Sequence, residues 1–123
     1  MPETKFDVDV AEQLSDRSFE ELKPYIPDLL EWLGDGNWPV ALPVSQVLRK
    51  FVPLISKEMM DVLSGDDDQL IYWCLTLLVA PEKDVISAEI INRLKEFAQN
   101  PTEVEKREEL DEIAGEILEE LQM

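Results

Sequence analysis

Apolar residues recur at helical spacing along most of the chain, and the clearest stripe lies in residues 18–33. One face of this segment carries Leu22, Ile26, Leu29, Leu30 and Leu33. Ser18 and Glu21 have the spacing of a capping box, in which each side chain binds a free backbone amide at the helix start. The pattern predicts a helix over 18–33, which Pro27 bends and which Gly34 ends by adopting a positive φ.

A turn and two further helices follow. Asp35, Gly36 and Asn37 are turn formers, and they separate the first helix from a second apolar stripe. We predict that Trp38 and Pro39 open this second helix, with the proline at its first position, and that the helix extends to residue 51. A third helix is predicted over 53–63.

The most apolar part of the chain is residues 70–79, where Thr76 is the main polar interruption. Asp66, Asp67 and Asp68 precede it, and carboxylates at a helix start bind free amides and suit the positive end of the helix dipole. The segment therefore predicts a central helix that its neighbours cover on most sides. A buried β-strand is the alternative for so short a run, but no other segment resembles a partner strand.

Two more helices are predicted after Pro81, over 85–98 and 101–121. Asn100, Pro101 and Glu103 form the start signal of the last one, with asparagine as the cap and proline at the first helical position. One side of this helix is apolar and the other is strongly acidic. Residues 1–17 have a weaker pattern, typical of a short leading helix or an arm.

A shift of 30 positions aligns the second helical hairpin with the first. Seven pairs of apolar residues then match: Leu29 with Met59, Leu30 with Met60, Leu33 with Leu63, Val40 with Leu70, Val44 with Cys74, Val47 with Leu77 and Leu48 with Leu78. Repeated helical hairpins are typical of an α-solenoid, although any two hairpins of equal length share some of these matches.

Composition limits the possible partners. The 123-residue chain is 45% hydrophobic, so we expect one domain over 18–123 that follows the arm or short helix over 1–17. Its formal net charge of -17 repels phosphate backbones and anionic lipids, and we expect no nucleic-acid or membrane partner. A basic protein partner suits this charge, and so does a surface that is acidic only for solubility. Without a signal peptide or a spanning segment, we expect a cytoplasmic protein.

Little in the sequence indicates catalysis. There is no histidine, which removes the commonest general base and metal ligand. Cys74 lies in the most apolar segment, where we expect a buried thiol rather than a nucleophile. The run from Asp66 to Asp68 lacks the ligand spacing of a calcium loop, so helix capping is favoured over metal binding. We expect no enzyme, no catalytic residue, no cofactor and no metal.

Several segments resemble a bacterial family of small helical proteins described only as a domain of unknown function. The resemblance extends over roughly residues 18–121 and lies in Phe19–Leu33, Asp35–Ala41 with its Asn-Trp-Pro element, Leu63–Asp68, Tyr72–Trp73, Asn100–Glu103 and Glu108–Ala114. It implies a HEAT-like helical fold and no established activity. With the repeat, it predicts an all-α protein: a short right-handed α-solenoid of about two to three stacked hairpins and about six to seven helices.

Aromatic side chains are the best candidates for recognition, because they are large, stiff anchors at interfaces. The candidate binding residues are Trp38, Asn37, Asp35, Trp73, Tyr72 and Trp32. Trp38 ranks first, since it lies in a turn beside polar groups. Packing of its ring against that turn is nevertheless the favoured interpretation, because tryptophans also fill helical cores.

We predict a non-catalytic protein–protein interaction module with an acidic surface. A sharper alternative is an immunity or inhibitor protein that neutralises a basic toxin domain, since opposite charges speed association. An alternative from another class is a divalent-cation binding protein or hydrolase that uses clustered carboxylates.

Overall fold

The structure is a computed structural model that describes residues 2–122. The helices run in this order: α1 (Val8–Gln13), α2 (Phe19–Leu22), α3 (Ile26–Glu31), α4 (Ala41–Arg49), α5 (Ser56–Leu63), α6 (Asp68–Cys74), α7 (Ala88–Gln99), α8 (Glu103–Arg107) and α9 (Leu110–Glu120). No strand occurs in residues 2–122, so the fold is all-α and the β-strand alternative for residues 70–79 is wrong. A π-helical segment, Leu75–Val79, continues α6.

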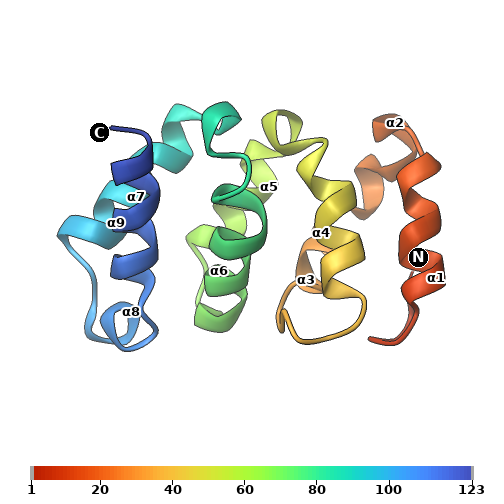
Figure 1. The fold of residues 1–123 in the computed structure, drawn as a ribbon, viewed down its shortest axis with the longest axis horizontal. Coiled ribbons are helices and arrows are strands. Elements are labelled where there is room, and N and C mark those ends of the chain that lie inside the picture. Colours follow the sequence, from red (N-terminus) through yellow and green to blue (C-terminus); the bar gives the residue numbers. More distant parts are fainter. Residues whose placement is uncertain (1, 123) are drawn as a thin grey trace.

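The helices lie in chain order along the long axis of the molecule, from α1 and α2 at one end to α7, α8 and α9 at the other (Figure 1). Helix α3 packs on α4, α5 on α6, and α7 on α9. Helix α4 also contacts α1 and the π-helical segment, which in turn contacts α9. One layer therefore contains α1, α4, α6 and α9, and a second layer contains α3, α5 and α7.

The core lies between these layers. Four of the seven pairs that match at the offset of 30 are buried on both sides, among them Leu33 with Leu63 and Leu48 with Leu78, whereas in the other three pairs the second residue is only partly buried. Phe97 from α7 is the largest side chain that is fully buried. The apolar stripes of the sequence thus mark the faces that the two layers turn toward each other.

Prolines divide the helices more often than the sequence predicted. The segment over 18–33 begins with the expected Ser18–Glu21 capping box, but a 3-10 turn at Lys23–Tyr25 separates α2 from α3. A proline has no N–H to donate within a helix, and this segment contains two. The expectation that Gly34 adopts a positive φ is wrong, because no glycine in residues 2–122 does so. The N–H of Gly34 instead donates to Glu31 at 3.0 Å in a tightened last turn.

Helix starts that prolines mark in the sequence also differ from the prediction, and α5 begins at Ser56 rather than at Pro53. Helix α4 begins at Ala41, so Trp38 and Pro39 lie in the preceding turn. Helix α8 is capped by Thr102, not by Asn100, and Pro101 precedes the cap. These errors have one cause: proline fits the first helical position, but it also fits the turn before a helix, and the sequence does not distinguish the two.

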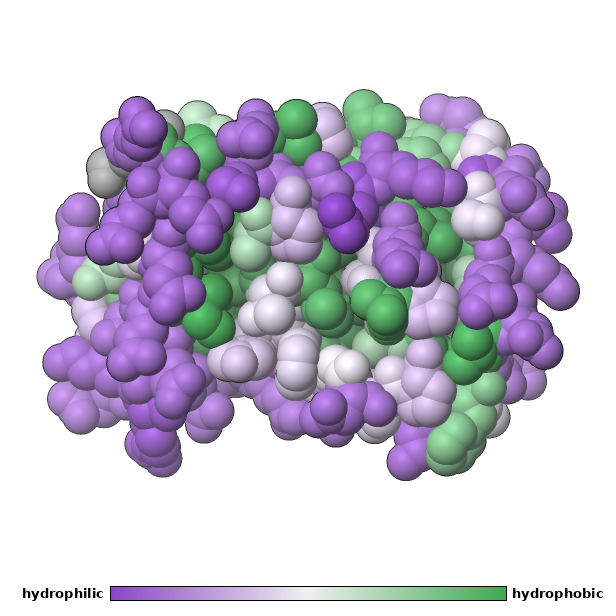
Figure 2. Space-filling model, viewed as in Figure 1, coloured by the Kyte–Doolittle hydropathy of each residue, from purple (hydrophilic) through white to green (hydrophobic). Residues whose placement is uncertain are grey.

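Hydrophilic residues cover both ends of the face shown in Figure 2, whereas pale and green residues gather in the middle, over α4 and α6. The reason lies in the sequence, because neither residues 38–48 nor residues 69–81 contain a charged side chain. The charge of the molecule is therefore concentrated on its other helices and on the turns.

Candidate functional site

Two tryptophans pack against the turn between α3 and α4. The rings of Trp32 and Trp38 meet edge to face, with centroids 6.1 Å apart, which is a favourable arrangement for aromatic quadrupoles. The six-membered ring of Trp38 also lies over Gly34. Both tryptophans are partly buried, so they stabilise the turn and keep part of each ring at the surface.

Trp73 reaches the same turn from α6. Its indole lies directly on Gly36, where an added Cβ atom would overlap the ring. Asp35 holds the turn in shape: its carboxylate accepts a hydrogen bond from the N–H of Asn37 at 2.8 Å, and its carbonyl accepts one from the N–H of Trp38 at 3.0 Å. The glycine thus allows a close contact between the first hairpin and the second.

Tyr72 extends this contact on the far side of Trp73. The two rings meet edge to face, with centroids 5.1 Å apart and planes at 82°. We call Trp32, Trp38, Trp73 and Tyr72 the aromatic row. All of the predicted binding residues lie in the row or in the turn that it packs against, and Asn37 is exposed at that turn.

A hollow of about 920 Å³ opens at the end of the aromatic row, between α6 and the corner where α8 meets α9. Its lining comes from these elements and from the turn before α6: Asp66, Asp67, Asp68, Gln69, Tyr72, Trp73, Arg107, Glu108 and Glu109. The hollow therefore includes two of the predicted residues, Tyr72 and Trp73. The α3–α4 turn with Trp38 does not line it.

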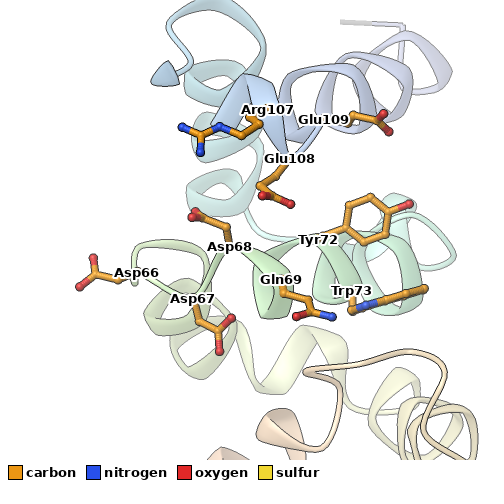
Figure 3. A pocket seen from close by; sticks show the side chains of 9 residues that line it. All are labelled: Asp66, Asp67, Asp68, Gln69, Tyr72, Trp73, Arg107, Glu108 and Glu109. Carbon is orange, nitrogen blue, oxygen red and sulfur yellow. The ribbon is translucent and has the colours of Figure 1, made fainter. Parts of the chain in front are cut away.

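The hollow has an aromatic wall and an acidic one. Figure 3 shows the carboxylate of Glu108 directed into the space between α8 and α6, on the side of Tyr72, whereas Asp68 is directed away from Tyr72 and Asp66 and Arg107 extend outward. The side chain of Asp67 has a second role, because it caps α6 by accepting a hydrogen bond from the N–H of Leu70 at 3.1 Å. The arrangement can hold a positively charged group against an aromatic ring.

The α8–α9 corner brings the acidic wall to α6. A capping box between Thr102 and Glu105 fixes the start of α8, and the chain then turns at Glu109, which has a φ of 64°. This left-handed conformation is uncommon for a residue other than glycine. The turn directs Glu108 and its neighbours toward Tyr72.

The sequence did not indicate this half of the site. It predicted one helix over 101–121, and on such a helix Glu108 and Glu109 belong to a uniform acidic face. Part of the signal was present, since Thr102 and Glu105 have the spacing of a capping box and mark a later helix start. No spacing links Glu108 to Tyr72, because their proximity depends on how the last hairpin packs on α6.

Cys74 lies behind the aromatic row and is fully buried. Burial disfavours the thiolate and raises the pKa of the thiol from 9.0 to about 12. A thiol with this pKa is protonated at neutral pH and is a weak nucleophile. Cys74 therefore acts as a small core residue.

The carboxylates of the hollow do not converge on one point. Among the described residues, no three Asp, Glu or Cys side chains are gathered as a metal ion requires. The hollow is better suited to a bulky cationic group than to a bare divalent ion.

Comparisons with known proteins address identity rather than activity. No helix within residues 2–122 is both long enough and apolar enough to cross a bilayer. A search of curated proteins gave no match. The family model described as a domain of unknown function, DUF5071, matches residues 1–118. Because this match spans nearly the whole chain, the protein belongs to the DUF5071 family.

Proposed function

We propose that this protein is a non-catalytic protein-interaction module, and that the hollow beside Tyr72 and Trp73 binds a positively charged side chain of a protein partner. In this proposal the hairpins α3–α4 and α5–α6, with α7–α9 after them, are the units of a short right-handed HEAT-like α-solenoid. Two observations support the solenoid: the sequence offset of 30 and the order of the helix pairs along one axis (Figure 1).

The chemistry of the hollow is the observation that carries the proposal. Five carboxylates and a single guanidinium line it. Within residues 2–122, none of these five carboxylates forms an ion pair. A lysine or arginine that enters the hollow gains attraction from several carboxylates and can lie against the ring of Tyr72.

The overall charge supports the same partner chemistry. A net charge of -17 attracts basic proteins from a distance and repels nucleic acid. The uncharged stretches over residues 38–48 and 69–81, the second of which begins at the hollow, supply a surface on which a protein can pack without burying unpaired charges. Electrostatic steering and a local cation site together favour a basic protein.

Two variants of equal charge test the proposal. The hollow variant carries Asp68→Asn, Glu108→Gln and Glu109→Gln. The control variant carries Glu112→Gln, Glu116→Gln and Glu119→Gln, three exposed positions of α9 outside the hollow. Each variant and the unmodified protein are tagged and used to capture proteins from the native host, and the captured proteins are quantified by mass spectrometry.

We expect the unmodified protein and the control variant to capture the same partners in equal amounts. The hollow variant should capture these partners at least about tenfold less, which corresponds to a loss of about 1.4 kcal/mol in binding free energy. Capture should also weaken as salt is raised, because the contact is charged and partly exposed. An equal loss in both variants would show that only total charge matters. No loss in the hollow variant would exclude the hollow as the site.

A further inference from the structure

A second concave surface lies on the other side of the turn before α6. This groove, between α3, α5 and the start of α6, has a volume of about 260 Å³. Apolar side chains make up much of its lining: Pro27, Leu30, Val62 and Leu70. Val62 and Leu70 are only partly buried, so the groove leaves apolar surface in contact with water.

The size of the groove restricts its occupant. An apolar cavity of about 150 Å³ holds one benzene molecule, and pockets for small-molecule ligands measure about 300–1,000 Å³. At about 260 Å³ the groove accommodates one large apolar side chain and part of the backbone that carries it. Its dimensions therefore match a peptide anchor better than a metabolite.

The charged groups around the groove are all of one sign. Five carboxylates belong to its lining, and no basic residue does: Glu31, Glu58, Asp61, Asp66 and Asp67. None of them forms an ion pair within residues 2–122. An apolar anchor alone would leave these charges partly desolvated without a partner, which is unfavourable. An anchor with lysine or arginine on both sides pairs them.

We propose that this groove docks a basic segment of a protein partner, which inserts one phenylalanine- or leucine-sized side chain between flanking cations. Asp66 and Asp67 line both the groove and the hollow, so the two surfaces meet at the turn before α6. One segment can therefore place its apolar anchor in the groove and a cation in the hollow. Binding of one segment to both surfaces rests on the proposed function of the hollow. Docking at the groove is inferred from the shape and charge of the groove alone.

A titration with a short synthetic peptide tests the groove directly, because the peptide supplies the anchor and the flanking cations by itself. The probe is acetyl-Lys-Lys-Phe-Lys-Lys-amide, added to the full-length isotope-labelled protein and followed by the chemical shifts of backbone amides. One control peptide replaces the phenylalanine with serine, and another replaces all four lysines with glutamate. A rim variant, Glu58→Gln with Asp61→Asn, is compared with a control of equal charge, Glu112→Gln with Glu116→Gln.

We expect saturable shifts at Leu30, Val62 and Leu70 with the first peptide only, and at least about fivefold weaker binding to the rim variant than to its control. Shifts confined to Tyr72, Trp73 and Glu108 would overturn the groove and leave the proposed function standing. Shifts confined to the groove would support the groove and contradict the hollow as a cation site. Shifts that depend on protein concentration without peptide would assign the groove to a second copy of the chain and overturn the proposal.

Discussion

Gly36 shows how a single residue can decide the packing of two hairpins. The indole ring of Trp73 packs against the backbone of Gly36, closer than any side chain at position 36 would allow. The same contact positions Tyr72, whose ring meets Trp73 edge to face at 5.1 Å between centroids. The wall of the hollow therefore depends on a glycine in the neighbouring hairpin.

Replacing Gly36 with alanine should destabilise the protein by about 1–3 kcal/mol, because the new Cβ atom forces the ring of Trp73 out of its place. Chemical denaturation followed by tryptophan fluorescence measures this loss. Gly115→Ala is the control: it lies inside α9, and an added Cβ there meets no atom within 4 Å. It should stabilise the protein by about 0.5–1 kcal/mol. A Gly36→Ala variant as stable as the parent would show that Trp73 can move freely.

Cys74 makes stability depend on alkaline pH. The folded thiol has a pKa of about 12 because it is buried, against 9.0 for a thiol in water. Between these values the unfolded chain loses its proton while the folded chain keeps it, so the free energy of unfolding falls as pH rises above 9. The slope from this group is at most about 1.4 kcal/mol per pH unit. The free energy of unfolding is measured by denaturation of the parent and of Cys74→Ala at pH 8 to 10.5. The difference between the two proteins isolates the contribution of the thiol from the titration of lysine and tyrosine.

A parallel change with pH in the parent and in Cys74→Ala would contradict the buried thiol. Thiol labelling gives an independent check. The native protein should react with iodoacetamide far more slowly than the unfolded chain, because the side chain is fully buried.

At the scale of elements, side-chain caps at helix starts and one arginine stabilise the short helices and their packing. Thr102 caps α8 with its side chain, which accepts a hydrogen bond from the N–H of Glu105 at 3.1 Å. Thr102→Ala should therefore cost about 1 kcal/mol, while Asn100→Ala should be close to neutral. Thermal unfolding of both variants distinguishes the two candidate caps. A larger loss for Asn100→Ala would restore the helix start that the sequence predicted.

Arg93 joins three elements of the last part of the chain. Its Nε donates to the carbonyl of Leu63 at 2.9 Å, at the end of α5, and its guanidinium stacks on Phe97 at 3.9 Å from the ring centroid. It also pairs with Glu96 at 3.1 Å and with Glu105 at 3.5 Å. Arg93 is 16% exposed and Glu105 13%, so solvent screens this pair weakly, whereas the side chain of Glu96 is mostly exposed.

Replacing Arg93 with lysine should destabilise the protein by about 1.5–3 kcal/mol, because a single ammonium group cannot make these divergent hydrogen bonds and the ring stack together. Urea denaturation measures the loss. Lys95→Arg, at an exposed position of α7, is the matched control and should be neutral. Equal stability of Arg93→Lys and the parent would mean that charge alone matters at this position.

The sequence predicts much of the element scale, because helical periodicity is a property of local spacing. The stripe over 18–33, the Ser18 capping box and the aspartate cap of α6 all appear in the structure. Helix breaks were harder to predict. The turn at Glu109 has no glycine or proline to mark it, although Glu109 adopts a positive φ.

At the scale of the whole molecule, repulsion among like charges opposes folding. The net charge is -17, and few of the 28 acidic side chains have a cationic partner because only 11 basic residues exist. Salt screens repulsion between exposed charges over about 10 Å at 0.1 M. The melting temperature should therefore rise between 0.01 and 0.3 M sodium chloride, as calorimetry can measure. A fall over this range would show that the surface ion pairs outweigh the repulsion.

The aromatic half of the candidate site could be predicted from the sequence, whereas the acidic half at the α8–α9 corner could not. Aromatic residues near a turn stand out in the sequence, and Trp73 and Tyr72 do line the hollow. The hollow itself exists because the third hairpin places Glu108 beside α6, and that depends on a long-range packing angle. Residue types indicate what a surface can bind, whereas only the packed structure shows where unlike residues meet.

Amide hydrogen exchange in the complex with a captured partner determines whether the partner binds at the hollow. Binding should slow exchange in residues 65–73 and 107–109, which form the hollow and the turn before α6, and should leave residues 112–120 of α9 unchanged. Protection confined to α9 or to α1, with no change in residues 65–73, would contradict a binding site at the hollow.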